Sequence, residues 1–305
     1  MNGLTNHVLM VRPHFFMKND QTAANNYFQN NISLTSEQIN KLALKEFDGF
    51  VNKLIDAGIN ITLIQDSKFP ITPDSIFPNN WVSFHKKNKI ILYSMYAANR
   101  RNERNIPIFE KLRDTGAKIE IIHDYTNYEK NNLFLEGTGS MVLDRVNKKC
   151  YASLSERTNK ELVIDFCNKM RYKPIFFRAY QTFNGKRLSI YHTNVMMSIG
   201  NKFAVVGIDS IDNVIEKQNV INELTSDGKE IISLSELQIQ NFAGNMLLLK
   251  NSKTPVLVMS SSAFDSLTNI QKLNLQNHSK IIHANLNTIE QIGGGSARCM
   301  LTEVF

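Results

Sequence analysis

Three residues of the sequence have types and spacings that suit catalysis: Glu136, His192 and Cys299. A carboxylate, an imidazole and a thiol are the groups with which enzymes orient a base, move a proton and attack a carbon centre. Glu136 and His192 lie 56 residues apart, and Asn80 precedes Glu136 by another 56. Cys299 follows His192 by 107 residues, close to two such intervals. The spacing predicts that matching positions of a repeat bring these four side chains together.

The surroundings of Cys299 favour a reactive thiol over a structural one. It ends the segment Gly293-Gly294-Gly295-Ser296-Ala297-Arg298-Cys299. Consecutive glycines cost conformational entropy and occur where the chain bends tightly or approaches a ligand. They also expose amide groups that can stabilise an oxyanion or a thiolate. Cys150 and Cys167 lie in apolar runs, so we expect them to be small buried hydrophobic residues rather than parts of a disulfide framework or zinc site.

The repeat itself is a helical stretch, a short polar turn and an apolar strand. Corresponding strand positions are 57, 56, 56 and 50 residues apart, which is typical of a repeat architecture. The predicted helix and strand pairs are Leu42–Ala57 with Ile61–Ile64, Ile106–Asp114 with Ile119–Ile122, Leu162–Met170 with Pro174–Phe177, Val214–Leu224 with Ile231–Leu234, and Phe264–Leu275 with Ile281–Ala284.

A second apolar strand follows each of these strands after a loop. The predicted segments are Trp81–Phe84, Met141–Leu143, Val195–Met197, Met246–Leu249 and Cys299–Leu301. Five such α/β units closing into a ring would form a single domain over residues 1–305, with the polar residues before the second strands at one end of its axis. An open doubly wound sheet is the alternative, but the glycine-rich first turn GxGxxG is missing.

The composition indicates a cytoplasmic globular enzyme. The chain has 305 residues, and no stretch approaches the ~18 apolar residues of a membrane helix. The net charge of +7 comes from 35 basic residues mixed with 28 acidic ones, whereas nucleic-acid binding requires a concentrated basic face. We therefore expect neither a nucleic-acid partner nor a membrane partner, while a homo-oligomer stays open.

Glu136-Gly137-Thr138-Gly139, His192-Thr193-Asn194 and the glycine-rich segment ending in Cys299 resemble the three catalytic blocks of the guanidino-group-modifying (pentein) superfamily. This superfamily includes arginine deiminases, dimethylarginine hydrolases and amidinotransferases. The resemblance covers nearly the whole chain and implies an α/β fold, the five-unit ββαβ pseudo-symmetric propeller (pentein fold). The segments starting at Met10 and at Asp74 are most similar to the citrulline-utilization hydrolases.

The same resemblance implies the substrate-binding residues. The segment Leu154–Asn159 is similar to one whose arginine binds the substrate α-carboxylate, which points to Arg157. Asn99–Glu103 is similar to a second such segment, which points to Arg100 or Arg101. Asp74 stands where relatives carry an acid near the substrate amine. No metal or organic cofactor is implied.

Two departures from the arginine deiminases bear on the substrate. Those enzymes hold a cationic guanidinium between two aspartates, and this chain has Asn80 and Asn194 at the two positions. An asparagine offers a donor and an acceptor, which match the NH₂ and C=O of a neutral ureido group. The substitutions favour citrulline over arginine.

The hypothesis is therefore a cysteine hydrolase that converts citrulline to ornithine, ammonia and carbon dioxide through an S-carbamoyl-cysteine. Cys299 would be the nucleophile, and His192, held by Glu136 or a neighbouring acceptor, the proton carrier. Within the class, the alternatives are an arginine deiminase, a dimethylarginine hydrolase and an amidinotransferase. Outside it, the alternative is an amino-acid-binding sensor that uses the same pocket without an activated cysteine.

Overall fold

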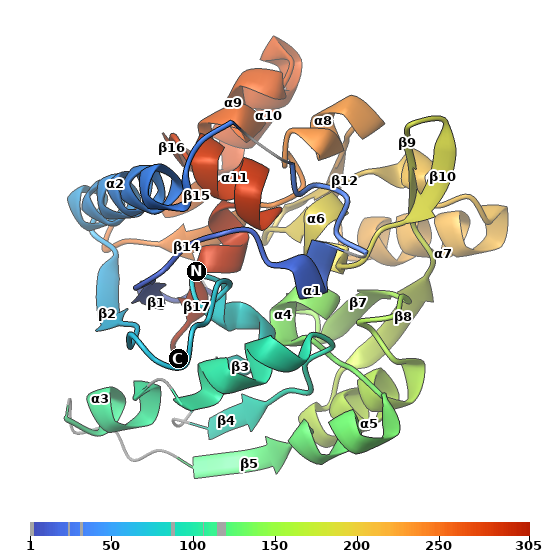
Figure 1. Cartoon of the computed structure of the whole chain (residues 1–305). Helices are drawn as coiled ribbons and strands as arrows, with labels where there is room; N and C mark the ends of the chain where they lie inside the picture. Colours follow the sequence, from blue (N-terminus) through green and yellow to red (C-terminus); the bar gives the residue numbers. More distant parts are fainter. Residues whose placement is uncertain (1–2, 24, 31–32, 87–88, 106, 115–119) are drawn as a thin grey trace.

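The strands of the protein form five three-stranded sheets of one pattern in an α/β fold (Figure 1). The computed structural model describes residues 3–23, 25–30, 33–86, 89–105, 107–114 and 120–305. In every sheet an inner strand runs antiparallel to a middle strand, which runs parallel to an outer strand. In this order the sheets are β17 (Thr302–Glu303), β1 (His7–Arg12) and β2 (Asn60–Gln65); β3 (Val82–His85), β4 (Lys89–Leu92) and β5 (Glu120–Asp124); β6 (Val142–Asp144), β7 (Lys149–Ser153) and β8 (Lys173–Phe177); β11 (Met197–Ile199), β12 (Phe203–Val206) and β13 (Glu230–Ser233); and β14 (Leu247–Lys250), β15 (Pro255–Ser260) and β16 (Lys280–Ala284).

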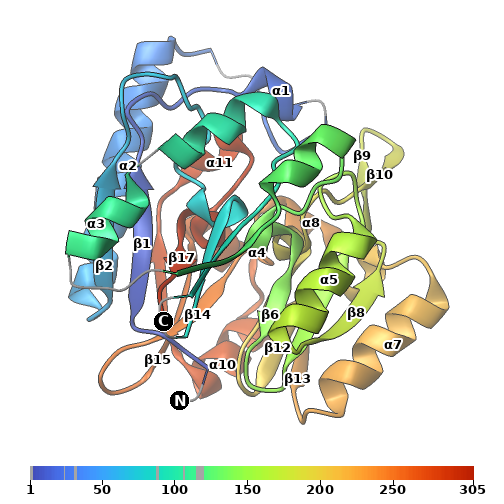
Figure 2. The same ribbon diagram turned by 90° about the horizontal axis from the view of Figure 1, so that it is seen from below.

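Helices connect the middle strand of each sheet to its outer strand and lie at the periphery of the molecule (Figures 1 and 2). The first sheet receives its inner strand, β17, from the C-terminal end of the chain. The connecting helices are α2 (Ser36–Asp56), α3 (Ile108–Asp114), α5 (Lys160–Met170), α7 (Val214–Thr225), and α9 (Ser261–Ser266) with α10 (Asn269–His278). The remaining elements are α1 (Asp20–Ala23), α4 (Gly137–Ser140), α6 (Thr193–Met196), α8 (Glu236–Gln240), α11 (Asn287–Gly293), the hairpin β9 (Tyr180–Phe183) and β10 (Lys186–Ser189), and the 3₁₀ turns η1 (Pro78–Asn80), η2 (Ala98–Asn105), η3 (Thr126–Asn131), η4 (Ile208–Ser210) and η5 (Ala297–Met300).

Helix α2 shows how the sequence specifies such a connection. Thr35 caps the helix by accepting a hydrogen bond from the N–H of Gln38, whose side chain in turn accepts from the Thr35 N–H. Its buried residues recur at helical spacing, as in Ala43, Phe47 and Leu54, and pack in one core cluster with β1 and α11. The middle strand β12 is buried along its whole length, which explains its continuous apolar sequence.

The predicted helices and strands agree with the structure in order, with three corrections. The predicted helix Phe264–Leu275 is two helices, because Leu267 is extended and Thr268 caps α10. Of the predicted strand Val195–Met197, only Met197 lies in a strand, because Val195 and Met196 belong to α6. The predicted strand Cys299–Leu301 is wrong as a whole, because these residues form the end and the C-cap of η5 and pairing starts at Thr302. Ile106 and residues 115–119, which belong to the second predicted unit, lie outside the described residues.

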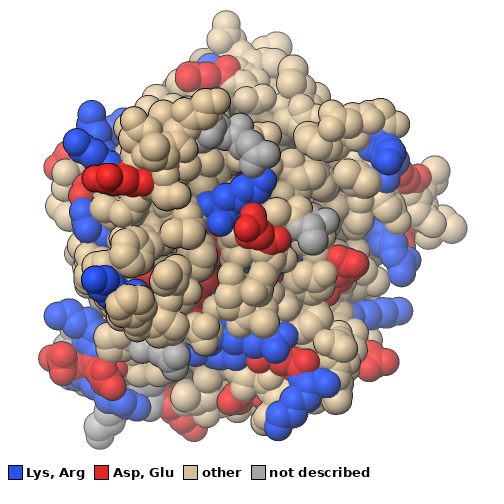
Figure 3. Space-filling model, viewed as in Figure 1, with Lys and Arg blue, Asp and Glu red and all other residues tan. Residues whose placement is uncertain are grey.

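Inner strands of neighbouring sheets contact one another: β3 lies against β17, and β11 lies against both β6 and β14. Hydrogen bonding between strands stays within each sheet in the part of the chain that is described. Among the same residues, no helix is both long and apolar enough to cross a membrane. On the face shown in Figure 3, basic and acidic side chains are interspersed.

Candidate active site

Five turns lead into the five inner strands, and each presents one polar residue. Asn80 ends η1, Glu136 and His192 are the N-caps of α4 and α6, and Cys299 lies in η5. Asn245 precedes β14. These residues are separated by 56, 56, 53 and 54 positions. The predicted equivalence of Asn80, Glu136, His192 and Cys299 along the repeat is therefore seen in the structure, and Asn245 completes the set.

Glycines allow the turns to approach one another. A Cβ atom on Gly137, whose φ is +49°, would lie 2.4 Å from the carbonyl oxygen of Asn79. A Cβ on Gly139 would lie 2.5 Å from Nδ2 of Asn80 and 2.8 Å from Nδ1 of His192. Any larger residue at these two positions would push the turns apart, so the motif following Glu136 is a packing requirement of the site.

Glu136 and His192 form a buried pair. Nε2 of His192 lies 2.7 Å from Oε2 of Glu136, while Oε1 accepts the backbone N–H of Tyr96 at 2.9 Å. Burial acts to raise the pKa of Glu136, but Arg157 and the hydrogen bond from His192 outweigh it and lower that pKa to about 2. Burial lowers the pKa of His192 to about 4 against the opposing effect of Glu136. The pair is thus a carboxylate and a neutral imidazole at pH 7.

Cys299 is buried, and asparagine amides surround its sulfur. Nδ2 of Asn245 lies 3.2 Å from Sγ, and Nδ2 and Oδ1 of Asn194 lie 3.6 and 3.9 Å away. Among the described residues, no carboxylate is a hydrogen-bond partner of this sulfur. The glycines ahead of Cys299 pack closely, since a Cβ on Gly293 or Gly295 would lie 2.9 Å from the ring of Phe77.

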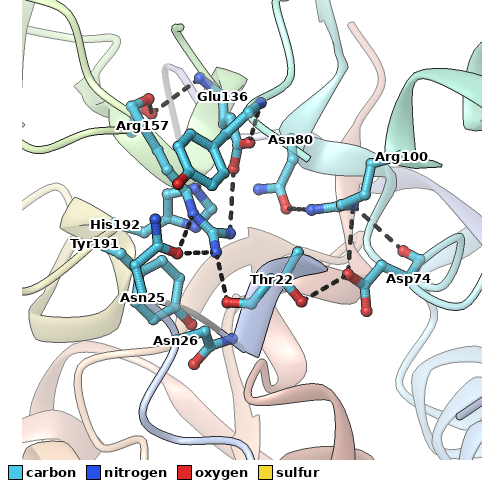
Figure 4. A network of polar contacts seen from close by, with 12 residues as sticks. Thr22, Asn25, Asn26, Asp74, Asn80, Arg100, Glu136, Arg157, Tyr191 and His192 are labelled. Atoms are coloured by element: carbon cyan, nitrogen blue, oxygen red, sulfur yellow. Dashed lines mark hydrogen bonds and ion pairs between the residues drawn. The ribbon is translucent and has the colours of Figure 1, made fainter. Parts of the chain in front are cut away.

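Asn80 and Arg100 belong to one buried network (Figure 4). Nη1 of Arg100 donates to Oδ1 of Asn80 at 2.7 Å, and the Nδ2 group of Asn80 has no partner in the described part of the chain. The rest of the guanidinium is bound by Glu103, at 2.7 and 2.9 Å, and by the carbonyl groups of Asp74 and Phe77. Arg100 is therefore fixed by hydrogen bonds within the protein, and its bond to Oδ1 fixes the orientation of the Asn80 side chain.

Arg157 lies between the Glu136–His192 pair and Thr22 of α1, and contacts both (Figure 4). Its Nη1 atom is 3.5 Å from Oε2 of Glu136, and its guanidinium stacks 4.8 Å from the ring of Tyr191. The remaining nitrogens donate to the carbonyl of Thr22 and to Oδ1 of Asn25. The carbonyl oxygen of Thr22 and Oδ1 of Asn25, both neutral, thus accept the hydrogen bonds that the family resemblance predicts for a substrate carboxylate.

Asp74 is buried on the opposite wall. Its Oδ2 atom accepts from Asn19 at 2.8 Å and lies 3.7 Å from Nε of Arg100. Its Oδ1 atom has no hydrogen-bond partner among the residues that the structure describes. Burial raises the pKa of Asp74 against the lowering effect of Arg100. An unpartnered carboxylate oxygen in a pocket wall is suited to a substrate ammonium group.

The structure brings eight of the nine predicted residues together and leaves Arg101 out. The side chain of Arg101 is 31% exposed and contacts Glu129 and the carbonyl groups of Met95 and Tyr96. The others surround a small cavity of about 20 Å³, with Glu136 behind His192 and Asn194 beside Cys299. Its wall is formed by Thr22, Asn26, Asp74, Phe77, Asn80, Arg100, Arg157, Tyr191, His192, residues 293–295 and Cys299.

Sequence reasoning missed Asn245, Tyr191 and the polar residues around α1. The 56-residue interval contained the signal for Asn245, because a fifth position was due between His192 and Cys299. The contacts of Thr22 and Asn25 carried no such signal, since they join residues more than 130 positions apart. No group of three or more His, Cys, Asp or Glu side chains in the described part of the chain is arranged to hold a metal ion.

The sequence model of the family described as N,N dimethylarginine dimethylhydrolase, eukaryotic, matches residues 12–305. A search of curated proteins gave no significant match. The N-terminal domain of ArgZ bound to product, an arginine dihydrolase from the ornithine-ammonia cycle in Cyanobacteria, aligns at 17% identity with a TM-score of 0.72, over 98% of this chain and 97% of that chain. AgrE with ornithine and NAD⁺ aligns at 17% identity and a TM-score of 0.74, over 98% of this chain and 39% of that chain. A dimethylarginine dimethylaminohydrolase variant, as its adduct with S-methyl-L-thiocitrulline, aligns at 14% identity and 0.63, over 98% and 99%. At these identities the structural matches establish the fold.

Proposed function

Since the chain belongs to the N,N-dimethylarginine dimethylhydrolase family, within the guanidino-group-modifying (pentein) superfamily, we propose that it hydrolyses citrulline to ornithine, ammonia and carbon dioxide. Membership makes the chain a hydrolase of carbon–nitrogen bonds that uses a cysteine. The proposal concerns the substrate and the roles of individual residues. It also takes residues 1–305 as one catalytic domain whose five ββαβ units surround one pseudo-symmetry axis, which the contacts between inner strands support.

The observation that carries the choice of substrate is the chemistry around the Cys299 sulfur. Its described partners are the amides of Asn194 and Asn245, and the unpartnered donor nearby is Nδ2 of Asn80. A guanidinium needs anionic acceptors, because a buried cation without them loses several kcal/mol, on the order of 3–5. A ureido group is neutral and needs donors for its oxygen as well as acceptors for its NH₂. Asn80 and Asn194 supply both.

Asp74 and Arg157 are proposed to hold the amino-acid end. The free Oδ1 atom of Asp74 would accept the α-ammonium group. Arg157 would bind the α-carboxylate in place of the Asn25 amide oxygen, because a charged acceptor forms the stronger hydrogen bond with a guanidinium. Arg100 is proposed to orient Asn80, and Arg101 has no proposed role in binding.

The proposed reaction begins with the imidazole of His192 in its neutral form, in which it can accept a proton. Nε2 of His192 faces Glu136, so Nδ1 is the nitrogen left to accept the proton of the Cys299 thiol. The thiolate attacks the ureido carbon, and the bond from that carbon to the side-chain nitrogen breaks as the imidazolium protonates the departing ornithine amine. The neutral imidazole then takes a proton from water, which attacks the S-carbamoyl-cysteine. Carbamate leaves, the thiolate is restored, and carbamate decomposes to ammonia and carbon dioxide.

A guanidino amino acid is the second candidate, and the relatives favour it. The matching family is named for dimethylarginine, and ArgZ is described as an arginine dihydrolase. The same thiol and imidazole would attack a guanidine carbon equally well. What opposes this candidate is the lack of a carboxylate among the described partners of the Cys299 sulfur.

The test is a product assay with citrulline, arginine, dimethylarginine and agmatine at equal concentrations, with ornithine, citrulline, dimethylamine, N-carbamoylputrescine and putrescine measured separately. Ornithine and ammonia from citrulline, with little turnover of the other three, is the expected result. Citrulline or ornithine formed from arginine at a higher kcat/KM would transfer the proposal to the guanidine. Calorimetric binding of citrulline without any product would indicate an amino-acid sensor.

A further inference from the structure

Asn245 occupies the one turn position of the five that has no role in the reaction proposed above. Its side chain is fully buried. Nδ2 lies 3.2 Å from Sγ of Cys299 and donates to the carbonyl of Asn194 at 2.9 Å, while Oδ1 accepts the N–H of Arg298 at 2.9 Å. We infer that Asn245 is a further catalytic residue, which holds the Cys299 sulfur in place and stabilises its thiolate by a hydrogen bond from Nδ2.

The orientation of this amide is determined by its partners. The two ends of an asparagine side chain resemble each other in shape, so the hydrogen-bond network must decide which end is the NH₂ group. On one side the partner is the backbone N–H of Arg298, which can only donate. On the other side it is the carbonyl of Asn194, which can only accept. The NH₂ group therefore faces Asn194 and, with it, the sulfur.

Asn194 contacts the same sulfur in a different way. Its Nδ2 and Oδ1 atoms lie 3.6 and 3.9 Å from Sγ, and its side-chain amide has no other partner among the described residues. That amide is free to turn toward a substrate. Asn245 is anchored at both ends, so its donor stays on the sulfur whether or not a substrate is bound.

The turn that carries Asn245 is built to reach the sulfur. A Cβ atom on Gly244 would lie 2.4 Å from the carbonyl oxygen of Val195, so only glycine lets this turn lie on α6. Phe242 adopts a left-handed backbone with φ +59°, and its carbonyl accepts the N–H of Asn245 at 2.8 Å. A left-handed conformation in a bulky residue is strained and persists where surrounding contacts require it.

A buried thiolate needs a hydrogen-bond donor, and the neighbouring cation, Arg298, makes its side-chain contacts with other groups. The Arg298 side chain donates to the carbonyl of Leu301 and lies 3.4 Å from Glu303. The charged and titratable groups of the cavity wall are His192, Tyr191, Asp74, Arg100 and Arg157. All of them are unchanged in the variants proposed below. Hydrogen bonds from neutral donors to an anion contribute about twice as much as neutral ones.

The inference rests on the proposed nucleophile, Cys299, but its test is independent of the substrate. The rate of alkylation of Cys299 by iodoacetamide is measured against pH, with the modified residue identified by mass spectrometry. Asn245→Asp keeps the shape and the acceptor for Arg298, and replaces the donor by an anion. Asn245→Leu removes both polar ends at similar volume. Both variants should move the midpoint of the alkylation profile upward by about 1–2 pH units and lower kcat about 10- to 100-fold.

Asn222→Asp, which places the same charge on the exposed face of α7, is the matched control and should leave the midpoint and kcat unchanged. Folded Asn245 variants with the wild-type midpoint would overturn the inference, although citrulline hydrolysis by Cys299 would stand. Substantial citrulline turnover by Cys299→Ala would instead refute the proposed function. Should neither Asn245 variant fold, the side-chain NH₂ resonances of Asn245 are followed by NMR in wild type. They should shift with thiol titration and lose that shift in Cys299→Ala, and pH-independent resonances would count against the inference.

Discussion

Nε2 of His192 and Oε2 of Glu136 are 2.7 Å apart, in a position where neither side chain is more than 3% exposed. Because burial lowers the pKa of His192 to about 4, the imidazole is neutral at pH 7 and carries its proton on Nε2. In the proposed mechanism, Glu136 would stabilise the imidazolium only once the thiol proton has moved to Nδ1. Charge therefore develops in the transition state beside a carboxylate that is already in place.

Glu136→Gln should lower kcat for citrulline by about 10²–10⁴-fold, because the amide preserves the volume but does not stabilise an imidazolium. KM should change less than kcat, since Glu136 does not form part of the cavity wall. Steady-state kinetics measure both. Glu223→Gln, which removes a carboxylate from ion pairs with Lys149 and Lys173 away from the cavity, is the control and should change kcat less than 2- to 3-fold. Equal effects of the two substitutions would remove Glu136 from the mechanism.

The same pair makes the stability of the fold depend on pH. The pKa of His192 is about 4 when folded and 6.5 ordinarily, so below pH 6.5 the unfolded chain binds this proton first. Unfolding free energy should therefore fall as pH is lowered from 6.5 to 4. Glu136, with its pKa lowered from 4.5 to about 2, adds a further loss between pH 4.5 and 2.

Urea unfolding of His192→Gln tests the first of these windows. In wild type, uptake of one proton by His192 on unfolding should give the unfolding free energy a slope of up to about 1.4 kcal/mol per pH unit between pH 6.5 and 4. The variant should lack this contribution. Cys299→Ala retains His192 and should keep the wild-type slope. An identical slope in His192→Gln and wild type would show that the imidazole is not held neutral by burial.

Cys299→Ala should abolish turnover with little loss of stability, because the thiol is small and the residue lies in a turn rather than in a strand. Loss of a covalent nucleophile typically costs more than ~10³-fold in kcat. Cys150→Ala is the matched control, since this thiol is also fully buried but lies in β7, away from the cavity. Its activity should match wild type after correction for the folded fraction. Residual activity of Cys299→Ala above about a thousandth would contradict the assignment of the nucleophile.

The α/β fold and the positions of the candidate reacting groups were accessible from the sequence because both follow a period. Helices, strands and the four residues Asn80, Glu136, His192 and Cys299 recur at nearly constant intervals, and the structure places each residue at the predicted turn. The contacts of Arg100 and Arg101 were not accessible. Neighbouring arginines on a 3₁₀ turn point in different directions, so only coordinates separate the buried Arg100 from the partly exposed Arg101.

The same limit applies to contacts between distant segments. Thr22 and Asn25, near the start of the chain, accept hydrogen bonds from Arg157. Such single polar contacts produce no periodic pattern in the sequence. The break of the helix predicted at Phe264–Leu275 was recognisable in principle. Thr268 and Gln271 form a capping box there, but the apolar spacing continues through it.

Arg157→Ala should raise KM for citrulline by a factor corresponding to about 2–4 kcal/mol, as expected for a buried charge-assisted pair. A smaller decrease in kcat is also expected, because Nη1 of Arg157 lies 3.5 Å from Glu136. Asn25→Ala removes the amide oxygen that accepts hydrogen bonds from Arg157, and should lower KM for citrulline or leave it unchanged. Agmatine lacks the α-carboxylate, so its processing by wild type as efficiently as an amino acid would contradict the role of Arg157.

In our proposal the choice between a ureido group and a guanidinium depends on Asn80 and Asn194, whose surroundings differ. Oδ1 of Asn80 already accepts from Arg100, so an aspartate at position 80 would pair with that guanidinium and be partly neutralised. The amide of Asn194 contacts only the Cys299 sulfur among the described residues. Asn194→Asp should therefore add more free negative charge to the site than Asn80→Asp.

The measurement is calorimetric binding of citrulline and arginine in a Cys299→Ala background, which prevents turnover. The parent should bind citrulline more tightly than arginine, and Asn80→Asp with Asn194→Asp should reverse that order because a guanidinium then meets two anions in a buried site. Of the single variants, Asn194→Asp should give the larger shift. Asn222→Asp on α7 adds one charge outside the cavity and should leave both affinities unchanged. Tighter binding of arginine by the parent would contradict the citrulline proposal and establish the guanidine as the ligand that this site prefers.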